Sequence, residues 1–149
     1  LPAPLDGLLV QANYTYTDAR GSVPDGDFAD LANVTDYRDI RLPSSSENTF
    51  NAVLGYEKGP LSLRLAGTYR DSYLDELGGD AEEDRFVDDH FQLDASAKVR
   101  ITPMVQVYAE WINITDAKYF AYNTYGGRRN LYQYEQYGST VKAGVKVNF

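Results

Sequence analysis

The sequence predicts an all-β fold, an antiparallel up-and-down meander whose strands form part of a transmembrane β-barrel. Three observations predict it. Apolar and polar side chains alternate with a period of two in six separate segments. Short and long connections alternate between those segments. The chain of 149 residues also carries 13 Tyr, a residue that suits a boundary where one end of the side chain is dry and the other wet.

The first three expected strands span residues 8–17, 50–57 and 61–70. In the first, every second residue from Leu8 to Tyr16 is apolar or Tyr, and the residues between are mostly polar, which gives the strand two unlike faces. The second alternates less cleanly. In the third, the face opposite the leucines carries Arg64 and Arg70, so burying that face in an apolar core would leave both arginines unsolvated.

The last three expected strands span residues 90–101, 105–111 and 137–149. The fourth strand is the clearest, because apolar side chains from Phe91 to Ile101 alternate strictly with polar ones from His90 to Arg100. Its length is close to the roughly 9 to 11 residues that a tilted membrane strand needs. Helical spacing appears nowhere with comparable strength, and no run approaches the roughly 20 apolar residues of a membrane-spanning helix.

The connections are sorted by length. Tight turns that contain Pro lie at 58–60 and 102–104, and residues 4–7 fit the same kind of turn. The long connections are 18–48, 71–89 and 114–131. Short and long ends therefore fall on opposite sides of one sheet, as in outer-membrane barrels with short periplasmic turns and long extracellular loops. The alternative, a soluble sandwich or a lipocalin-like barrel, gives no reason for this sorting.

The expected strands are too few to close a membrane barrel, since the smallest single-chain barrels have about 8. Either further strands lie upstream or several copies build one barrel. The chain starts at Leu1 without an initiator Met or an export signal, which favours the first expectation.

Four segments carry a family resemblance: residues 5–18 (LDGLLVQANYTYTD), 42–44 (LPS), 113–116 (NITD) and 134–149 (YEQYGSTVKAGVKVNF). They resemble the C-terminal end of TonB-dependent receptors, most closely a subfamily abundant in proteobacteria of the Xanthomonas and Caulobacter type. Two positions depart from the family pattern, because Ile114 stands where Leu is usual and Ser139 where Arg is usual.

The resemblance implies that residues 1–149 are the last six strands of a 22-stranded barrel in the bacterial outer membrane, without the plug domain and the earlier strands. It implies active uptake of a bulky nutrient, such as a siderophore-iron complex or an oligosaccharide, powered through TonB. The alternative is a passive porin or a structural barrel built from several chains.

An enzyme is not expected, because His90 is the only histidine and no nucleophile motif accompanies it. The net charge of -8 argues against a nucleic-acid partner.

Two sets of residues are expected to contact partners of the barrel. One resembles the signal by which the barrel assembly machinery recognises a terminal strand through strand addition: Tyr137, Val145, Val147 and Phe149. The other lies on the inward face and would contact the plug domain or line a water-filled lumen: Asn13, Arg64, Arg70, Asp94, Lys98, Glu110 and Lys142. The outward face is expected to contact outer-membrane lipid.

The long connections hold the candidate ligand and metal sites. Aromatic rings can stack on a planar or sugar-like ligand, and the guanidinium groups of Arg can form paired hydrogen bonds with it. The candidate ligand-binding residues are therefore Tyr122, Tyr125, Arg128 and Arg129. Hard oxygen ligands suit calcium, which could also bridge lipopolysaccharide phosphates, and this points to Asp80, Glu82, Glu83 and Asp84. A solvated acidic face is the alternative for the second set. Residues 113–116 are expected to form a structural turn where a strand leaves the membrane.

Overall fold

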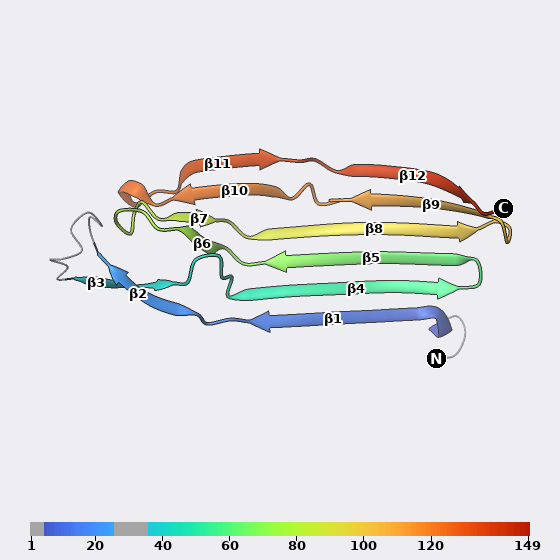
Figure 1. Cartoon of the computed structure of the whole chain (residues 1–149), viewed down its shortest axis with the longest axis horizontal. Helices are drawn as coiled ribbons and strands as arrows, with labels where there is room; N and C mark the ends of the chain where they lie inside the picture. The colour runs from blue at the N-terminus through green and yellow to red at the C-terminus, as the bar shows by residue number, and fades with distance from the viewer. Residues whose placement is uncertain (1–4, 26–35) are drawn as a thin grey trace.

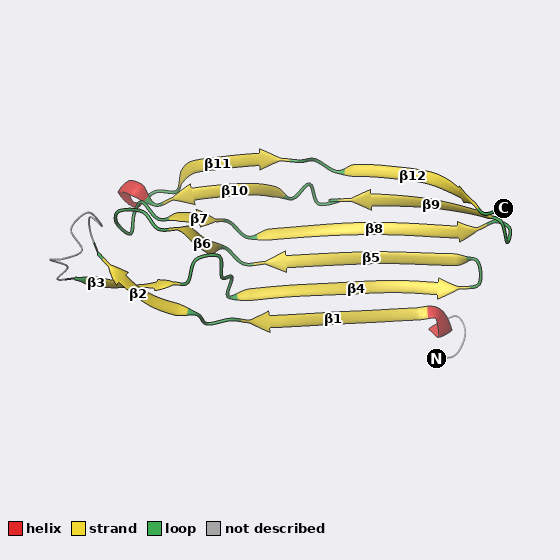
Figure 2. Cartoon of the chain, in the orientation of Figure 1, coloured by secondary structure: helices red, strands yellow, loops and turns green. Residues whose placement is uncertain are grey.

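The computed structural model describes residues 5–25 and 36–149, and strands make up most of it (Figure 2). Six long strands lie side by side in one antiparallel sheet in the order β1-β4-β5-β8-β9-β12 (Figure 1). Their bounds are β1 Leu8–Tyr16, β4 Asn48–Lys58, β5 Leu61–Arg70, β8 His90–Arg100, β9 Val105–Ile112 and β12 Thr140–Val147. The expected all-β, antiparallel meander is confirmed. Within the described residues the sheet is open, because β1 and β12 are each paired on one side only.

The short turns, the start of β1 and the end of β12 lie at one end of this sheet (Figure 1). The β4–β5 turn passes through Gly59, whose φ of 57° favours glycine. In the β8–β9 turn, the hydroxyl of Thr102 accepts hydrogen bonds from the backbone N–H groups of Met104 and Val105. At the start of β1, a 3-10 turn η1 (Leu5–Gly7) brings Asp6 within 2.8 Å of Lys58. Within the described part of the chain, no helix is long and apolar enough to cross a membrane.

The long connections at the other end form strands of their own, which the sequence analysis did not predict. One hairpin pairs β2 (Arg20–Pro24) with β3 (Tyr37–Arg41). A second sheet has the order β11-β10-β7-β6, built from β6 Tyr73–Glu76, β7 Arg85–Val87, β10 Lys118–Asn123 and β11 Asn130–Gln136. We call these six short strands and their turns the hairpin platform. Polar composition suggested loops, but hairpin pairing satisfies the backbone groups of these segments.

The expected boundaries of the sixth strand were wrong. Residues 130–136 form β11, and β12 begins only at Thr140, after Gly138 with a φ of 72°. Tyr137 and Phe149 therefore lie outside any strand. The positive φ at Gly138 interrupts extended backbone, and this is the physical reason that the strand begins later than expected.

The register places most of the apolar side chains of the six long strands on one face, as the alternation predicted. One row crosses the whole sheet through Val10, Leu54, Leu65, Ala95, Trp111 and Val141. The neighbouring row on the opposite face contains Arg64, Ser96, Glu110 and Lys142. A shift of one residue in any pair would exchange the two faces, so the register follows from the pattern.

An aromatic row lies on the apolar face near the hairpin platform. It crosses four strands through Tyr14, Phe50, Tyr69 and Phe91. The Tyr14 hydroxyl donates to the side-chain oxygen of Asn48 at 2.6 Å, and the Tyr69 hydroxyl donates to Asp71 at 2.7 Å. The four rings therefore border the apolar face, and the hydroxyls of the two tyrosines reach polar groups at its rim.

The buried apolar side chains lie in the hairpin platform and not in the long sheet. Among the described residues they are Ile40, Leu74, Val87, Ala121 and Tyr122. On the long sheet, by contrast, Val10 is 67% exposed, Trp111 46% and Val141 68%. No described residue of the chain covers the apolar face of the six long strands.

Candidate functional site

The turn at residues 113–116 joins the long sheet to the hairpin platform. Asn113 is buried, with a φ of 56°. Its side-chain amide donates to the carbonyls of Ala117 and Gly138 at 3.2 Å each, and its side-chain oxygen accepts from the Ala117 N–H at 2.8 Å. The Thr115 hydroxyl donates to the carbonyl of Phe91 at 2.9 Å. The expectation of a structural turn is confirmed, because these side chains bind the turn to β8 on one side and to the segment before β12 on the other.

A second junction between the two regions centres on Asp71. Its carboxylate accepts hydrogen bonds from the Asn48 side-chain amide and the Tyr69 hydroxyl, and its N–H donates to the Asn48 carbonyl at 3.0 Å. The hydrogen bond from Asn48, followed by that from Tyr69, lowers the pKa of Asp71 from its ordinary value of 3.8. The ionised carboxylate is therefore the form that holds this junction together.

We expect the Asp71 junction to loosen in acid. Because the pKa of Asp71 is lower in the folded state than in the unfolded chain, its stabilisation is complete above the ordinary pKa and is lost as pH falls through the lowered one. Protection of the Asp71 amide against hydrogen exchange, corrected for the intrinsic rate, should decrease as the pH falls below about 4. In Asp71→Asn the protection should be lower at neutral pH and flat across this range. The same pH dependence in the variant would contradict the assignment.

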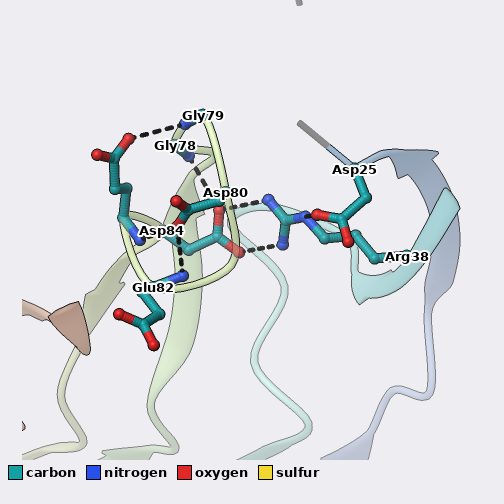
Figure 3. Close-up of polar contacts among 8 residues, drawn as sticks. Asp25, Arg38, Gly78, Gly79, Asp80, Glu82 and Asp84 are labelled. Atoms are coloured by element: carbon teal, nitrogen blue, oxygen red, sulfur yellow. Dashed lines mark hydrogen bonds and ion pairs between the residues drawn. The ribbon is translucent and has the colours of Figure 1, made fainter. Parts of the chain in front are cut away.

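A buried ion pair ties the β2–β3 hairpin to the turn between β6 and β7 (Figure 3). Arg38 on β3 donates from both terminal nitrogens to the Asp84 carboxylate, at 2.5 and 2.8 Å. The side chains are 12% and 4% exposed, and Asp84 also accepts the Gly78 N–H at 2.9 Å. The hydrogen bond to Asp84 raises the pKa of the Arg38 guanidinium. Asp84, an expected calcium ligand, is thus engaged by an internal cation.

The other three expected calcium ligands face separate backbone donors. Asp80 accepts the N–H groups of Glu82 and Glu83 at 2.9 and 3.2 Å (Figure 3). Glu82 accepts the N–H of Gly126 at 2.9 Å, and Glu83 accepts that of Gly79 at 3.2 Å. No group of three or more acidic or His side chains in the described part of the chain is arranged to hold a metal ion. Calcium binding by these residues stays a prediction without geometric support.

The expected ligand residues divide into two pairs. Tyr122 on β10 is 8% exposed, because its ring stacks on Phe86 with centroids 5.7 Å apart and the Arg129 guanidinium lies 4.0 Å from its centroid. Arg129 also pairs with Asp88 at 2.9 Å. Tyr125 lies in the 3-10 turn η3 (Tyr125–Gly127), and Arg128 follows it, both exposed. Tyr122 is therefore buried in the platform, Arg129 lies over its ring with a side chain that is 54% exposed, and Tyr125 and Arg128 face solvent.

A cleft of about 610 Å³ opens beside Tyr125 between the β6–β7 turn and the β10–β11 hairpin. Its lining is Glu76, Leu77, Gly78, Glu83, Arg85, Asn123, Tyr125, Asn130 and Tyr132, which we call the tyrosine cleft. The sequence analysis missed most of this set. The signal that could have found Tyr132 is the glycine pair 126–127 between two polar-aromatic segments, which is typical of a hairpin turn.

The remaining expected residues lie on the long sheet. Arg64, Glu110 and Lys142 share one row of the polar face, and Asn13, Arg70, Asp94 and Lys98 lie on the same face. Val145 and Val147 lie on the apolar face of β12, the edge strand. The register therefore places the seven polar residues on one face of the sheet.

The structure has two surfaces with distinct chemistry: an apolar sheet face that no described residue covers, and a polar cleft at the opposite end from the short turns. Comparison with known proteins finds no matching family model, no similar curated protein and no similar solved structure.

Proposed function

We propose that the chain is a segment of a transmembrane β-barrel in the bacterial outer membrane, and that it works within an energy-coupled receptor that imports a bulky nutrient. One observation carries the proposal: six adjoining strands present a continuous apolar face that no described residue covers, opposite a face that carries charge. Soluble proteins rarely expose an apolar patch of this extent, whereas lipid would cover it without a partner protein.

The dimensions support a membrane position. A strand of about 9 residues, at ~3.3 Å per residue and a tilt of about 40°, spans ~23 Å, close to the apolar band of about 25 Å in outer-membrane barrels. The aromatic row at Tyr14, Phe50, Tyr69 and Phe91 fits the girdle of rings at a membrane boundary. In this orientation the hairpin platform is extracellular and the short turns are periplasmic.

The polar face and the open edges support a larger barrel. Backbone groups at an open sheet edge have no hydrogen-bond partners in lipid, so β1 and β12 require neighbouring strands. Arg64, Glu110 and Lys142 would then face the interior, where a plug domain or water can solvate them. Together with the sequence resemblance, this favours a TonB-dependent receptor whose partners are its own plug, TonB, the barrel assembly machinery and outer-membrane lipid.

Cysteine accessibility on whole cells tests the orientation. The described chain has no cysteine, so Arg128→Cys in the platform and Met104→Cys in a short turn can be placed in a cysteine-free full-length protein. A membrane-impermeant maleimide should label Arg128→Cys on intact cells and Met104→Cys only after the outer membrane is permeabilised. Equal labelling of both on intact cells, or recovery of the protein in the soluble fraction, would refute the membrane proposal. Uptake that persists with a protonophore would point to a passive porin.

A further inference from the structure

The tyrosine cleft has the size of a small-molecule site, since such sites have volumes of about 300 to 1,000 Å³. Two tyrosine rings line it and both are exposed, Tyr125 by 62% and Tyr132 by 57%. Tyr125 comes from η3 and Tyr132 from β11, so the hairpin itself sets their separation. Arg85 lies 5.2 Å from the Tyr132 centroid and supports that ring from one side. Exposed rings held in this way offer flat surfaces for stacking.

Two amides in the same cleft are fixed in orientation. The Asn130 amide nitrogen lies within hydrogen-bond distance of the carbonyls of Tyr125 and Arg128, at 2.8 and 3.1 Å, and of the Asn123 side-chain oxygen at 3.2 Å. These contacts leave the Asn130 side-chain oxygen and the Asn123 amide nitrogen without a hydrogen bond to any described residue. The Asn130 oxygen can accept a hydrogen bond and the Asn123 amide nitrogen can donate one. Two such groups held side by side suit the hydroxyl groups of a ligand, because a hydroxyl both donates and accepts.

The charge of the cleft selects against anions. Arg85 is its one cationic lining residue, and this guanidinium is paired with Asp75 and lies 3.2 Å from Glu76. Glu76 and Glu83 supply two carboxylates to the lining, so with Asp75 the acidic groups outnumber the cation. A carboxylate-rich or phosphate-rich ligand would meet like charge and no free Arg or Lys in the lining.

We infer that the tyrosine cleft binds a neutral, polyhydroxylated ligand of the oligosaccharide class and rejects polyanionic ligands, a negatively charged ferric chelate among them. The inference rests on the proposed function, because it names the ligand class that the extracellular platform would present for import. Stacking on Tyr125 and Tyr132 supplies contact area, and the two amides and two carboxylates receive the hydroxyl groups.

Binding isotherms on the purified full-length protein test this, with neutral hexasaccharides of glucose, mannose, galactose and xylose as probes and hexagalacturonate as the anionic probe. At least one neutral probe should bind better than hexagalacturonate. Replacing Tyr125 and Tyr132 together by Ala should weaken that binding by about tenfold or more. Tyr134→Ala is the matched control, because Tyr134 is an exposed ring on the same strand, two residues along from Tyr132 and outside the cleft.

A second pair of substitutions tests the charge argument. Glu76→Gln with Glu83→Gln should shift the preference of the cleft from the neutral probe toward hexagalacturonate, because the two substitutions remove like charge from the lining. Binding of no neutral probe, a preference for hexagalacturonate in the wild type, or equal effects of the Tyr125/Tyr132 and Tyr134 variants would overturn the inference.

Maleimide labelling on the same cells separates the two proposals. Correct labelling without saccharide binding defeats the cleft assignment alone. Saccharide binding by a soluble protein defeats the membrane proposal alone.

Discussion

In the proposed outer-membrane barrel, Leu65→Arg is expected to remove most of the full-length protein from the membrane. Leu65 lies in the middle of β5 on the apolar face, between Leu54 and Ala95 of the adjoining strands. An Arg on the lipid face near the midplane of the membrane costs about 2 to 4 kcal/mol, because its charge loses water without gaining a partner. That cost is a large share of the stability of most proteins, so folding and insertion should both fail.

Ala66→Arg is the matched control for this experiment. Ala66 is the next residue of the same strand, points to the polar face and lies opposite Asp94 of β8. The same charge there meets water and a carboxylate, so the amount inserted should stay close to the wild type. The measurement is the quantity of protein in the outer-membrane fraction, together with the urea midpoint of the inserted protein. A wild-type amount of Leu65→Arg, or equal loss in both variants, would contradict the assignment of the faces.

Arg38→Ala is expected to release the β2–β3 hairpin from the rest of the platform. The substitution leaves the Asp84 carboxylate, 4% exposed, without its cation, and removing one partner of a buried pair costs about 3 to 5 kcal/mol. Hydrogen exchange at the Gly78 amide, which donates to Asp84, should then accelerate by about 100-fold or more, since each 1.4 kcal/mol is about tenfold. Asp84→Asn with Arg38→Met should restore part of the protection, because that pair buries no lone charge.

Arg20→Ala serves as the control for the buried pair. Arg20 belongs to the same hairpin, but its pair with Asp18 has side chains 68% and 47% exposed. Exposed pairs contribute about 0 to 1 kcal/mol, so this variant should leave the Gly78 exchange rate nearly unchanged. Equal rates in the Arg38 and Arg20 variants would show that the buried pair does not hold the platform.

The sequence by itself determined the long strands and their two faces. A period of two is a local property of each segment, and side chains of an extended chain point alternately to opposite sides whatever the strand is paired with. Once Ala95 and Lys98 are assigned to opposite faces of β8, pairing with β5 and β9 must keep apolar beside apolar, so the register follows as well. The tight turns followed from Pro and Gly in the same local way.

Tertiary structure alone decided the candidate site. A register shift between Ala121 and Tyr122 accompanies the turn of Tyr122 into the packing of β7 and β10, while Tyr125, three residues later, remains in solvent. Asp84 is one acid in an acidic run by sequence, and only the approach of Arg38, 46 residues away, makes it a buried partner. Such contacts depend on how separate hairpins dock, and polar segments carry no periodicity from which their docking could be predicted.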